Sequence, residues 1–392
     1  MTMIEEREIE RQQPYFYWLY RVAGIGNVTI EHLFERVKAP EEIYYAKEEI
    51  LQQWKQEGIL GEKQLYNLKS SRRNYNMYSE YDKLGKMRIQ MYPFYHPDYP
   101  VRLSAIPDRP GAIFVKGKLP DERKKSLAII GARSCSAYGK RMAERFAQEL
   151  ALAGIQIISG MARGVDGISQ SAALRAGGAS FGVLGCGVDI CYPIQNLGLY
   201  EELEKRGGII SAYLPGTLPK PQYFPPRNRI ISGLADALLV IEAREKSGTL
   251  ITVDMALEQG REVYALPGRV SDAVSDGCNR LIEQGAGIAL SPEYLLAELT
   301  GNSISKNTEN AEARLMEAKL REKEAMLTEE EAEIFRLLDE YPKSISDICQ
   351  EIKRQSGQSI ELPEVMERLV RLCIKGAAAQ EGTHYYTRRI EE

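Results

Sequence analysis

Short runs of β-branched and aliphatic residues alternate with amphipathic helical stretches between residues 127 and 290. One such stretch, 138–151, places Met142, Phe146 and Leu150 on one face at a spacing of four residues. This alternation is typical of βα units in a parallel sheet. We therefore expect a Rossmann-like, doubly wound α/β domain with a mainly parallel sheet. Its strands are predicted at 127–131, 156–159, 180–184, 208–211, 237–241, 262–265 and 287–290.

The turns that follow these strands are rich in glycine, serine and arginine. In a doubly wound sheet, ligands bind beyond the carboxyl ends of the strands, where the strand order reverses. Glycine in such a turn permits the close approach of a phosphate, and Ser or Thr at a helix start supplies hydroxyl groups. The turns that carry this pattern are 131–139, 159–167, 185–193, 247–252 and 265–268.

The first of these turns does not have the dinucleotide fingerprint. Arg133 occupies the position where that fingerprint has a glycine against the pyrophosphate, and no ribose-binding acid ends the next strand. The sequence therefore argues against an NAD-type cofactor, and we expect none. An arginine at this position would instead bind a backbone phosphate.

A second distinctive stretch, 223–233, has an aromatic residue before two prolines and two arginines around an asparagine, at a predicted helix start. It would offer a stacking ring and two guanidinium groups to an anionic, planar ligand such as nucleic acid or a nucleotide. Alternatively, Phe224 packs into the core and the arginines are solvated or paired with carboxylates. On this stretch alone both interpretations stay open.

Helical segments are expected on either side of the α/β domain. Residues 1–88 have the composition of a helical domain that resembles a SAM or helix-hairpin-helix module. Its Gly24-Ile25-Gly26 turn either approaches a DNA phosphate or simply joins two packed helices. The Tyr- and Pro-rich start of the 89–300 domain suggests an extended lead-in with an edge strand at 112–115.

The C-terminal part of the sequence divides into two segments. Residues 301–326 are polar and charged and are predicted to form a linker. Residues 327–392 contain three helical stretches and a short hairpin, which suggests a winged helix. The third stretch, 362–375, is mixed in charge, which favours a structural or protein-contact role over DNA readout.

Composition limits the other classes of site. The net charge is only −4, so a nucleic-acid site must be a local basic pocket. Six cysteines without a CxxC pair and only three histidines argue against zinc and against a disulfide framework, so no metal is expected. Because no apolar run approaches the roughly 18 residues that a membrane span needs, we expect a soluble, cytoplasmic protein.

Taken in order, these turns resemble those of the DNA-processing protein A family, also called DprA or Smf. The blocks that carry the resemblance are Gly131-x-Arg133 with Tyr138-Gly139, Ser159-Gly160-x-Ala162-Arg163-Gly164-x-Asp166, Gly185-x-Gly187-x-Asp189-x-x-Tyr192-Pro193, Gly216-Thr217, Phe224-Pro225-x-Arg227-Asn228-Arg229-Ile230-Ile231-Ser232-Gly233, Glu242-Ala243, Ser247-Gly248-Thr249-Leu250-Ile251-Thr252 and Pro267-Gly268. The resemblance implies a non-enzymatic protein that binds single-stranded DNA, forms a homodimer through its α/β domain and hands the strand to the RecA recombinase. Natural transformation and recombination are the processes implied.

The resemblance also implies the DNA-binding residues. Arginines would hold phosphates, Phe224 would stack on a base, glycines would permit close approach, and the Ser247-Gly248-Thr249 turn would add donors. The expected set is Gly131, Arg133, Gly160, Arg163, Gly164, Lys220, Phe224, Arg227, Asn228, Arg229, Ser247, Gly248 and Thr249. No catalytic residue is expected. Gln170 replaces a histidine and Ala212 a glutamate found in many members, and neither lies in this set.

Two alternatives remain on the same scaffold. A phosphoribohydrolase-like enzyme that acts on nucleotides would need a carboxylate near the ribose, and Asp166, Asp189 and Glu242 are the candidates. Each of these also has an ordinary role as a helix cap or as the partner of an arginine. A nucleotide sensor that signals through the winged helix is the other alternative.

Overall fold

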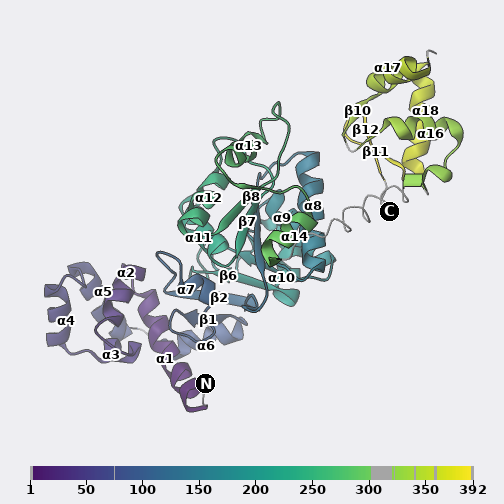
Figure 1. Cartoon of the computed structure of the whole chain (residues 1–392). Coiled ribbons are helices and arrows are strands. Elements are labelled where there is room, and N and C mark those ends of the chain that lie inside the picture. The colour runs from purple at the N-terminus through teal and green to yellow at the C-terminus, as the bar shows by residue number, and fades with distance from the viewer. Residues whose placement is uncertain are drawn as a thin grey trace. The chain divides into compact units, whose positions relative to one another are not determined.

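The computed structural model describes residues 3–74, 76–301, 320–321, 323–339, 341–356 and 360–389. The chain divides into two compact units, Met1–Asn302 and Ser303–Glu392, which are described separately (Figure 1). Most of the predicted linker, 301–326, lies outside the described residues. The predicted domain boundaries stay predictions.

The first unit is built on a mixed, mostly parallel sheet, as predicted. Within the described residues it is nine-stranded, in the order β1-β2-β6-β5-β4-β3-β7-β8-β9. From β6 to β9 in this order, each strand is parallel to its neighbour. The strands are β1 Gln90–Pro93, β2 Ala112–Gly117, β3 Ser126–Ile130, β4 Gln156–Ser159, β5 Ser180–Val183, β6 Gly208–Ser211, β7 Ala237–Val240, β8 Glu262–Ala265 and β9 Gly287–Ile288.

The prediction of an edge strand at 112–115 was wrong in its position. This segment lies inside β2, which pairs antiparallel with β6 on one side and with β1 on the other. The edge strand is β1, from the Tyr- and Pro-rich lead-in. Its Pro93 stands opposite Ala112 at the strand end, where a missing N–H does not interrupt the sheet.

Helices cover both faces of the parallel part of the sheet (Figure 1). Alternate residues of β3 enter different cores: Leu127 and Ile129 pack on one face, and Ala128 and Ile130 on the other. One core contains residues of α8 (Ala137–Leu152), α9 (Val165–Arg175) and α14 (Pro292–Thr300). The opposite core contains residues of α7 (Val101–Ser104), α11 (Phe224–Gly233), α12 (Gly248–Glu258) and α13 (Asp276–Glu283). All five residues of β3 are buried because successive side chains point to opposite faces and helices cover both faces.

The N-terminal helices share a hydrophobic core with the antiparallel edge of the sheet. Phe16 and Trp18 are buried in one cluster with Phe114 of β2 and Ile209 of β6. The helices of this unit that have not yet been given bounds are α1 Met3–Arg21, α2 Asn27–Phe34, α3 Pro40–Tyr45, α4 Glu48–Gln56, α5 Glu62–Asn74, α6 Met77–Lys86 and α10 Leu197–Arg206.

The Gly24-Ile25-Gly26 turn connects α1 and α2. Gly24 has φ +87°, a left-handed conformation that favours glycine. Two amides of α5 hold the turn, because Gln64 Nε2 donates to the Gly24 carbonyl at 2.7 Å and Asn67 Nδ2 donates to the Ala23 carbonyl at 2.7 Å. The turn thus has the packing role that the sequence left open, and DNA contact there stays a prediction.

The second unit contains α16, α17, α18 and a small antiparallel sheet in its described part. Phe335, Ile348 and Leu369 meet in its core. The elements are α16 Glu329–Leu337, β10 Lys343–Ser344, α17 Ile345–Ser356, α18 Leu362–Ile374, β11 Ala378–Gln380 and β12 Tyr385–Arg388, with the strand order β10-β12-β11. The helices and hairpin lie where they were predicted, and the winged-helix assignment stays a prediction.

Candidate nucleic-acid interface

The strand order reverses between β3 and β7. Successive strands β4, β5 and β6 are added on one side of β3, and β7, β8 and β9 on the other. The turns after β3 and β7 therefore flank the switch point, where open α/β sheets bind their ligands. The turns after β4 and β5 lie at the same ends of the strands, on one side of the switch point. We call these carboxyl ends, with the segments that follow them, the rim.

The first two turns interlock. The N–H of Val165 donates to the Ala132 carbonyl at 3.2 Å. Gly164 has φ +75°, and a Cβ there would lie 2.3 Å from the Ala132 oxygen. This contact places the turn that carries Arg133 against the turn that carries Arg163. Both arginines are exposed, and neither has an ion pair or side-chain hydrogen bond within the described ranges. Two of the predicted arginines therefore stand free on the rim.

Other predicted glycines are required by packing. A Cβ on Gly131, directly after β3, would lie 2.7 Å from Val165 Cγ2. A Cβ on Gly160 would lie 2.7 Å from Asp166 Oδ2 and 2.8 Å from Arg227 Nη2. These glycines allow the turns to pack closely against each other, so packing within the rim explains why side chains are missing at both positions.

Arg227 lies beneath the rim, with only 5% of its surface exposed. Its Nη1 donates to the carbonyls of Gly160, at 2.7 Å, and Val183. Burial lowers the pKa of Arg227, and the opposing effect of the Asp166 charge is smaller. Arg227 thus ties together the ends of β4 and β5, and a direct contact with phosphate stays a prediction.

Asp166 is the buried counter-charge, 7% exposed. Its Oδ2 accepts from the N–H of Gly160 at 3.2 Å. Burial raises the pKa of Asp166, and the opposing effect of the Arg227 charge is smaller. Asn228, the next residue after Arg227, accepts from Arg227 Nε at 3.2 Å, so this part of the motif is a closed polar network.

Arg229 is not brought together with Arg133. Its Nη1 lies 3.5 Å from Asp108 Oδ2, and its Nε donates to the Pro226 carbonyl at 3.2 Å. Asp108 belongs to the segment between α7 and β2, on the α11 face of the sheet. The Arg-Asn-Arg motif therefore divides, with one arginine beneath the rim and the other paired with a carboxylate.

Phe224 begins α11, with Pro225 and Pro226 in its first turn. Its ring is partly buried: a Cβ on Gly185 would lie 2.9 Å from Phe224 Cδ1, and the ring of Tyr192 is 5.5 Å away. Lys220 is exposed, with Nζ 5.9 Å from the Tyr223 ring. An aromatic cluster with a neighbouring cation thus follows β5 and β6.

The N-terminus of α12 is open. Its N-cap residue Ser247 makes no capping hydrogen bond, and the first turn has no acidic residue. Ser247 Oγ is buried and has no hydrogen-bond partner among the residues that the structure describes. A Cβ on Gly248 would meet no atom within 4 Å, and Thr249 follows in the same turn. The N–H groups and dipole of such a helix end favour an anion.

Two further cations flank this helix end. Arg244 and Lys246 are exposed in the turn after β7, and neither has an ion pair in the part of the chain that the structure describes. Neither residue belongs to the set predicted from the sequence. Glu245, which lies between them in the sequence, pairs with Arg280 at 2.7 Å.

The N-terminus of α8, in contrast, is filled by the protein itself. Glu242, only 1% exposed, accepts from the N–H of Ser136 at 2.8 Å and from Ser136 Oγ at 2.5 Å. A Cβ on Gly139 would lie 2.3 Å from the Glu242 carboxyl carbon. A pyrophosphate occupies the corresponding helix end in dinucleotide-binding folds, so this arrangement argues against that ligand class.

The same geometry bears on the candidate catalytic carboxylates. Glu242 caps α8, and Asp166 is bonded beneath the rim. Asp189 accepts from the N–H of Gly216 at 2.9 and 3.0 Å through its two oxygens. Glu242 and Asp166 thus have the ordinary roles expected from the sequence, helix cap and partner of an arginine, whereas Asp189 binds a loop N–H instead.

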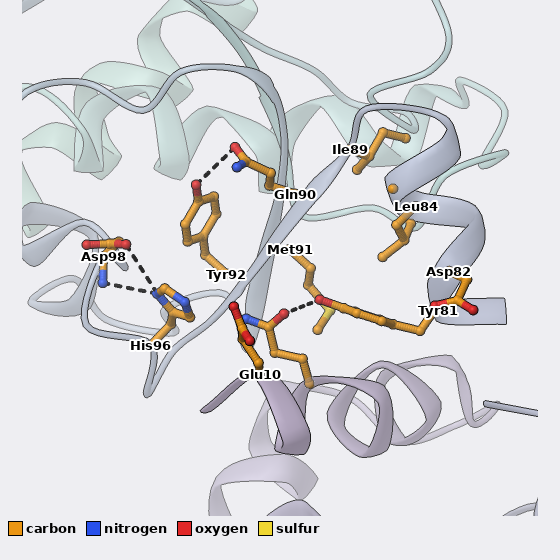
Figure 2. A pocket seen from close by; sticks show the side chains of 12 residues that line it. Glu10, Tyr81, Asp82, Leu84, Ile89, Gln90, Met91, Tyr92, His96 and Asp98 are labelled. Carbon is orange, nitrogen blue, oxygen red and sulfur yellow. Dashed lines mark hydrogen bonds and ion pairs between the residues drawn. The ribbon is translucent and has the colours of Figure 1, made fainter. Parts of the chain in front are cut away.

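A separate cavity of about 380 Å³ lies between α1, α6 and β1, away from the rim (Figure 2). Glu10, Asp82 and Asp98 are the charged residues in its lining. His96 Nδ1 accepts from the N–H of Asp98 at 3.1 Å, and burial lowers the pKa of His96, which favours the neutral imidazole. An acidic lining repels phosphate, so this cavity does not suit nucleic acid.

No cluster of three or more His, Cys, Asp or Glu side chains arranged for a metal occurs among the described residues. Over the same part of the chain, no helix combines the length and apolar character needed to cross a membrane.

The fold and the rim together define the class of protein. It is a doubly wound α/β protein with cations on its switch-point rim, in which Glu242 occupies the helix end that binds pyrophosphate in dinucleotide-binding folds. Residues 90–300 match the family model of DNA recombination-mediator protein A. The chain belongs to this family of recombination mediators.

Known proteins of this family resemble the chain over its α/β part. Protein Smf of Escherichia coli is 45% identical over 202 residues, which are 51% of this chain and 54% of that protein, so the chain matches about half of its length. The X-ray structure of DprA from Streptococcus pneumoniae has a TM-score of 0.64 and 32% identity, and covers 73% of this chain and 98% of its own. A DprA structure from Helicobacter pylori, which concerns single-stranded DNA binding by that protein, has a TM-score of 0.50 and 28% identity, over 55% of this chain and 98% of its own.

Proposed function

We propose that this chain binds single-stranded DNA along its switch-point rim, without sequence preference, as a recombination mediator. The observation that carries the proposal is the order of groups along the rim. Across β6, β5, β4, β3 and β7, the segments that follow the strands present Phe224, Tyr192, Arg163, Arg133 and the open end of α12. Neighbouring strands are about 4.8 Å apart, so these groups form a continuous track.

The chemistry of this track suits a single strand. Unpaired arginines and a helix N-terminus attract phosphates, and an accessible aromatic ring stacks on an unpaired base of any kind. Base pairs in a duplex hide the base faces that the ring would contact. We therefore expect binding that prefers single strands and falls with salt.

We also propose that the chain does not process nucleotides. The three carboxylates that a phosphoribohydrolase-like reaction could use are bonded to backbone or hydroxyl groups, and Asp166 and Glu242 are buried. No observation favours a nucleotide sensor over the strand-binding proposal.

As partners we propose the RecA recombinase, which would receive the bound strand, and a second copy of the chain through the α/β domain, in the cytoplasm. The family's description as a recombination mediator supports the RecA part of this proposal. Protection of incoming strands in natural transformation is the process to which it would belong.

The test is a titration of a labelled single-stranded oligonucleotide with the full chain at two salt concentrations, repeated with duplex of the same sequence. Salt-sensitive binding that prefers the single strand is the expected result. A parallel incubation with nucleoside monophosphates should release no free base. Equal indifference to both DNA forms, or release of base, would contradict the proposal.

A further inference from the structure

We infer that Tyr192 is a base-contacting residue, the solvent-facing ring of a two-ring platform whose inner ring is Phe224. The inference rests on the proposed single-strand binding and adds a residue to the site. It also changes the expected role of Phe224, from the ring that meets the base to the ring that supports it.

The geometry of the two rings carries the inference. Their centroids are 5.5 Å apart and their planes are inclined by 32°. A base inserted between them would need about 7 Å, two van der Waals separations of roughly 3.5 Å. The rings are therefore in contact with each other, and a base must stack on an outer face.

Exposure decides which ring offers that face. Phe224 is partly buried against Gly185, with the Arg227 guanidinium carbon 5.8 Å from its ring. Tyr192 is 44% exposed. Its hydroxyl makes no hydrogen bond within the described ranges, so contact with Phe224 is what orients this ring.

The segment that carries Tyr192 is fixed in place. Asn196 Nδ2 donates to the carbonyls of Met161 and Ala162, at 2.9 and 3.1 Å, which ties the segment to the turn after β4. On the other side, the N–H of Ile190 donates to the Gly187 carbonyl at 3.0 Å. A ring held in this way loses little conformational freedom on binding.

Position along the rim agrees with this role. The turn to which Asn196 is tied also carries Arg163, one of the free cations. Ile194 and Leu197, close to Tyr192 in sequence, are also exposed. An exposed apolar surface next to a free guanidinium group fits a nucleotide unit, with its base on the ring and its phosphate on the arginine.

The test compares Tyr192→Ala, Tyr192→Phe and Tyr192→Leu in the full chain, with Tyr66→Ala as the control for an exposed tyrosine elsewhere. Each variant is titrated with a labelled oligo-dT strand and with an abasic strand of equal length. We expect Tyr192→Ala and Tyr192→Leu to weaken oligo-dT binding about 5- to 150-fold. Abasic binding and the salt dependence should stay unchanged, and Tyr192→Phe and Tyr66→Ala should resemble the parent.

Tyr192→Leu keeps an apolar contact with Phe224, so it serves as the decisive variant if Tyr192→Ala does not fold. Oligo-dT binding by Tyr192→Leu equal to that of the parent would overturn the inference, as would an equal loss for the abasic strand. If the parent protein itself binds no single strand, the proposed function fails, which is a distinct result.

Discussion

Arg227 and Arg229 are two positions apart in one motif, and their side chains have different surroundings. Residues of an α-helix are rotated by about 100° each, so two side chains at this spacing point about 200° apart. Once α11 begins at Phe224, the two side chains leave the helix in nearly opposite directions. The helix start was predicted from the sequence, and this rotation explains why the two side chains have different surroundings. A phosphate contact of either arginine stays a prediction.

Replacement of Arg227 tests its role beneath the rim. Arg227→Ala leaves Asp166 buried without its counter-charge and deprives the carbonyls of Gly160 and Val183 of a donor. We expect the free energy of unfolding to fall by about 3–5 kcal/mol, measured by chemical denaturation. Arg133→Ala, an exposed change, should alter it by less than about 0.5 kcal/mol. An Arg227→Ala variant of unchanged stability that loses DNA binding would instead assign this side chain to phosphate.

Two glycines at helix starts separate architecture from ligand approach. Gly164→Ala combines φ +75° with a Cβ 2.3 Å from a carbonyl oxygen, so we expect a marked loss of stability. Gly248→Ala meets no atom within 4 Å and should fold normally, while its methyl group lies where a phosphate would approach α12 and should weaken single-strand binding. Thermal melts and strand titrations measure both effects. Unchanged binding by Gly248→Ala would remove α12 from the track.

The contact between α8 and α14 predicts a pH dependence. Burial and a hydrogen bond with Glu293 raise the pKa of Glu149 from 4.5 to about 7. Burial also acts on Glu293, but hydrogen bonds from Glu149 and Ser291 outweigh it and lower its pKa. Because the folded state holds the Glu149 proton more tightly than the unfolded chain, stability from this group is present below pH 4.5 and is lost as the pH rises to about 7.

Glu149→Gln removes that titration. The free energy of unfolding of the variant, relative to that of the parent, should increase from pH 5 to pH 8. Chemical denaturation at both pH values measures this change. Glu144→Gln, on the same helix, is the control and should show no such gain. If the parent and Glu149→Gln keep the same difference in stability at both pH values, the carboxyl pair does not share a proton.

At this scale, much of the fold could be predicted from the sequence. The parallel strands appeared within two residues of their predicted bounds, because buried β-branched runs bounded by glycine are a local signal. The β1 edge was missed, because only tertiary pairing shows that 90–93 adds to β2. The turns of the site were also predicted locally, whereas Glu242 closes α8 across 106 residues of sequence, which no local pattern reveals.

For the whole molecule, the distribution of charge matters more than its sum. A net charge of −4 gives no general attraction for DNA. Many surface cations are paired within the described residues, whereas Arg133, Arg163, Arg244 and Lys246 stand free on adjacent turns. Binding must then depend on a few local phosphate contacts, and its salt dependence should report how many there are.

The most direct test of this account is the salt dependence of single-strand affinity in the Arg133→Ala/Arg163→Ala double variant. Each phosphate neutralised on a single strand contributes about 0.7 to the slope of log K against log salt, so the slope should fall by about 1.4. The control is Arg123→Ala, an arginine with an 89% exposed side chain in the turn before β3, at the amino end of that strand and not at its carboxyl end. We expect a reduced slope for the double variant alone. A slope equal to that of the parent would contradict the claim that the switch-point rim is where the strand is bound.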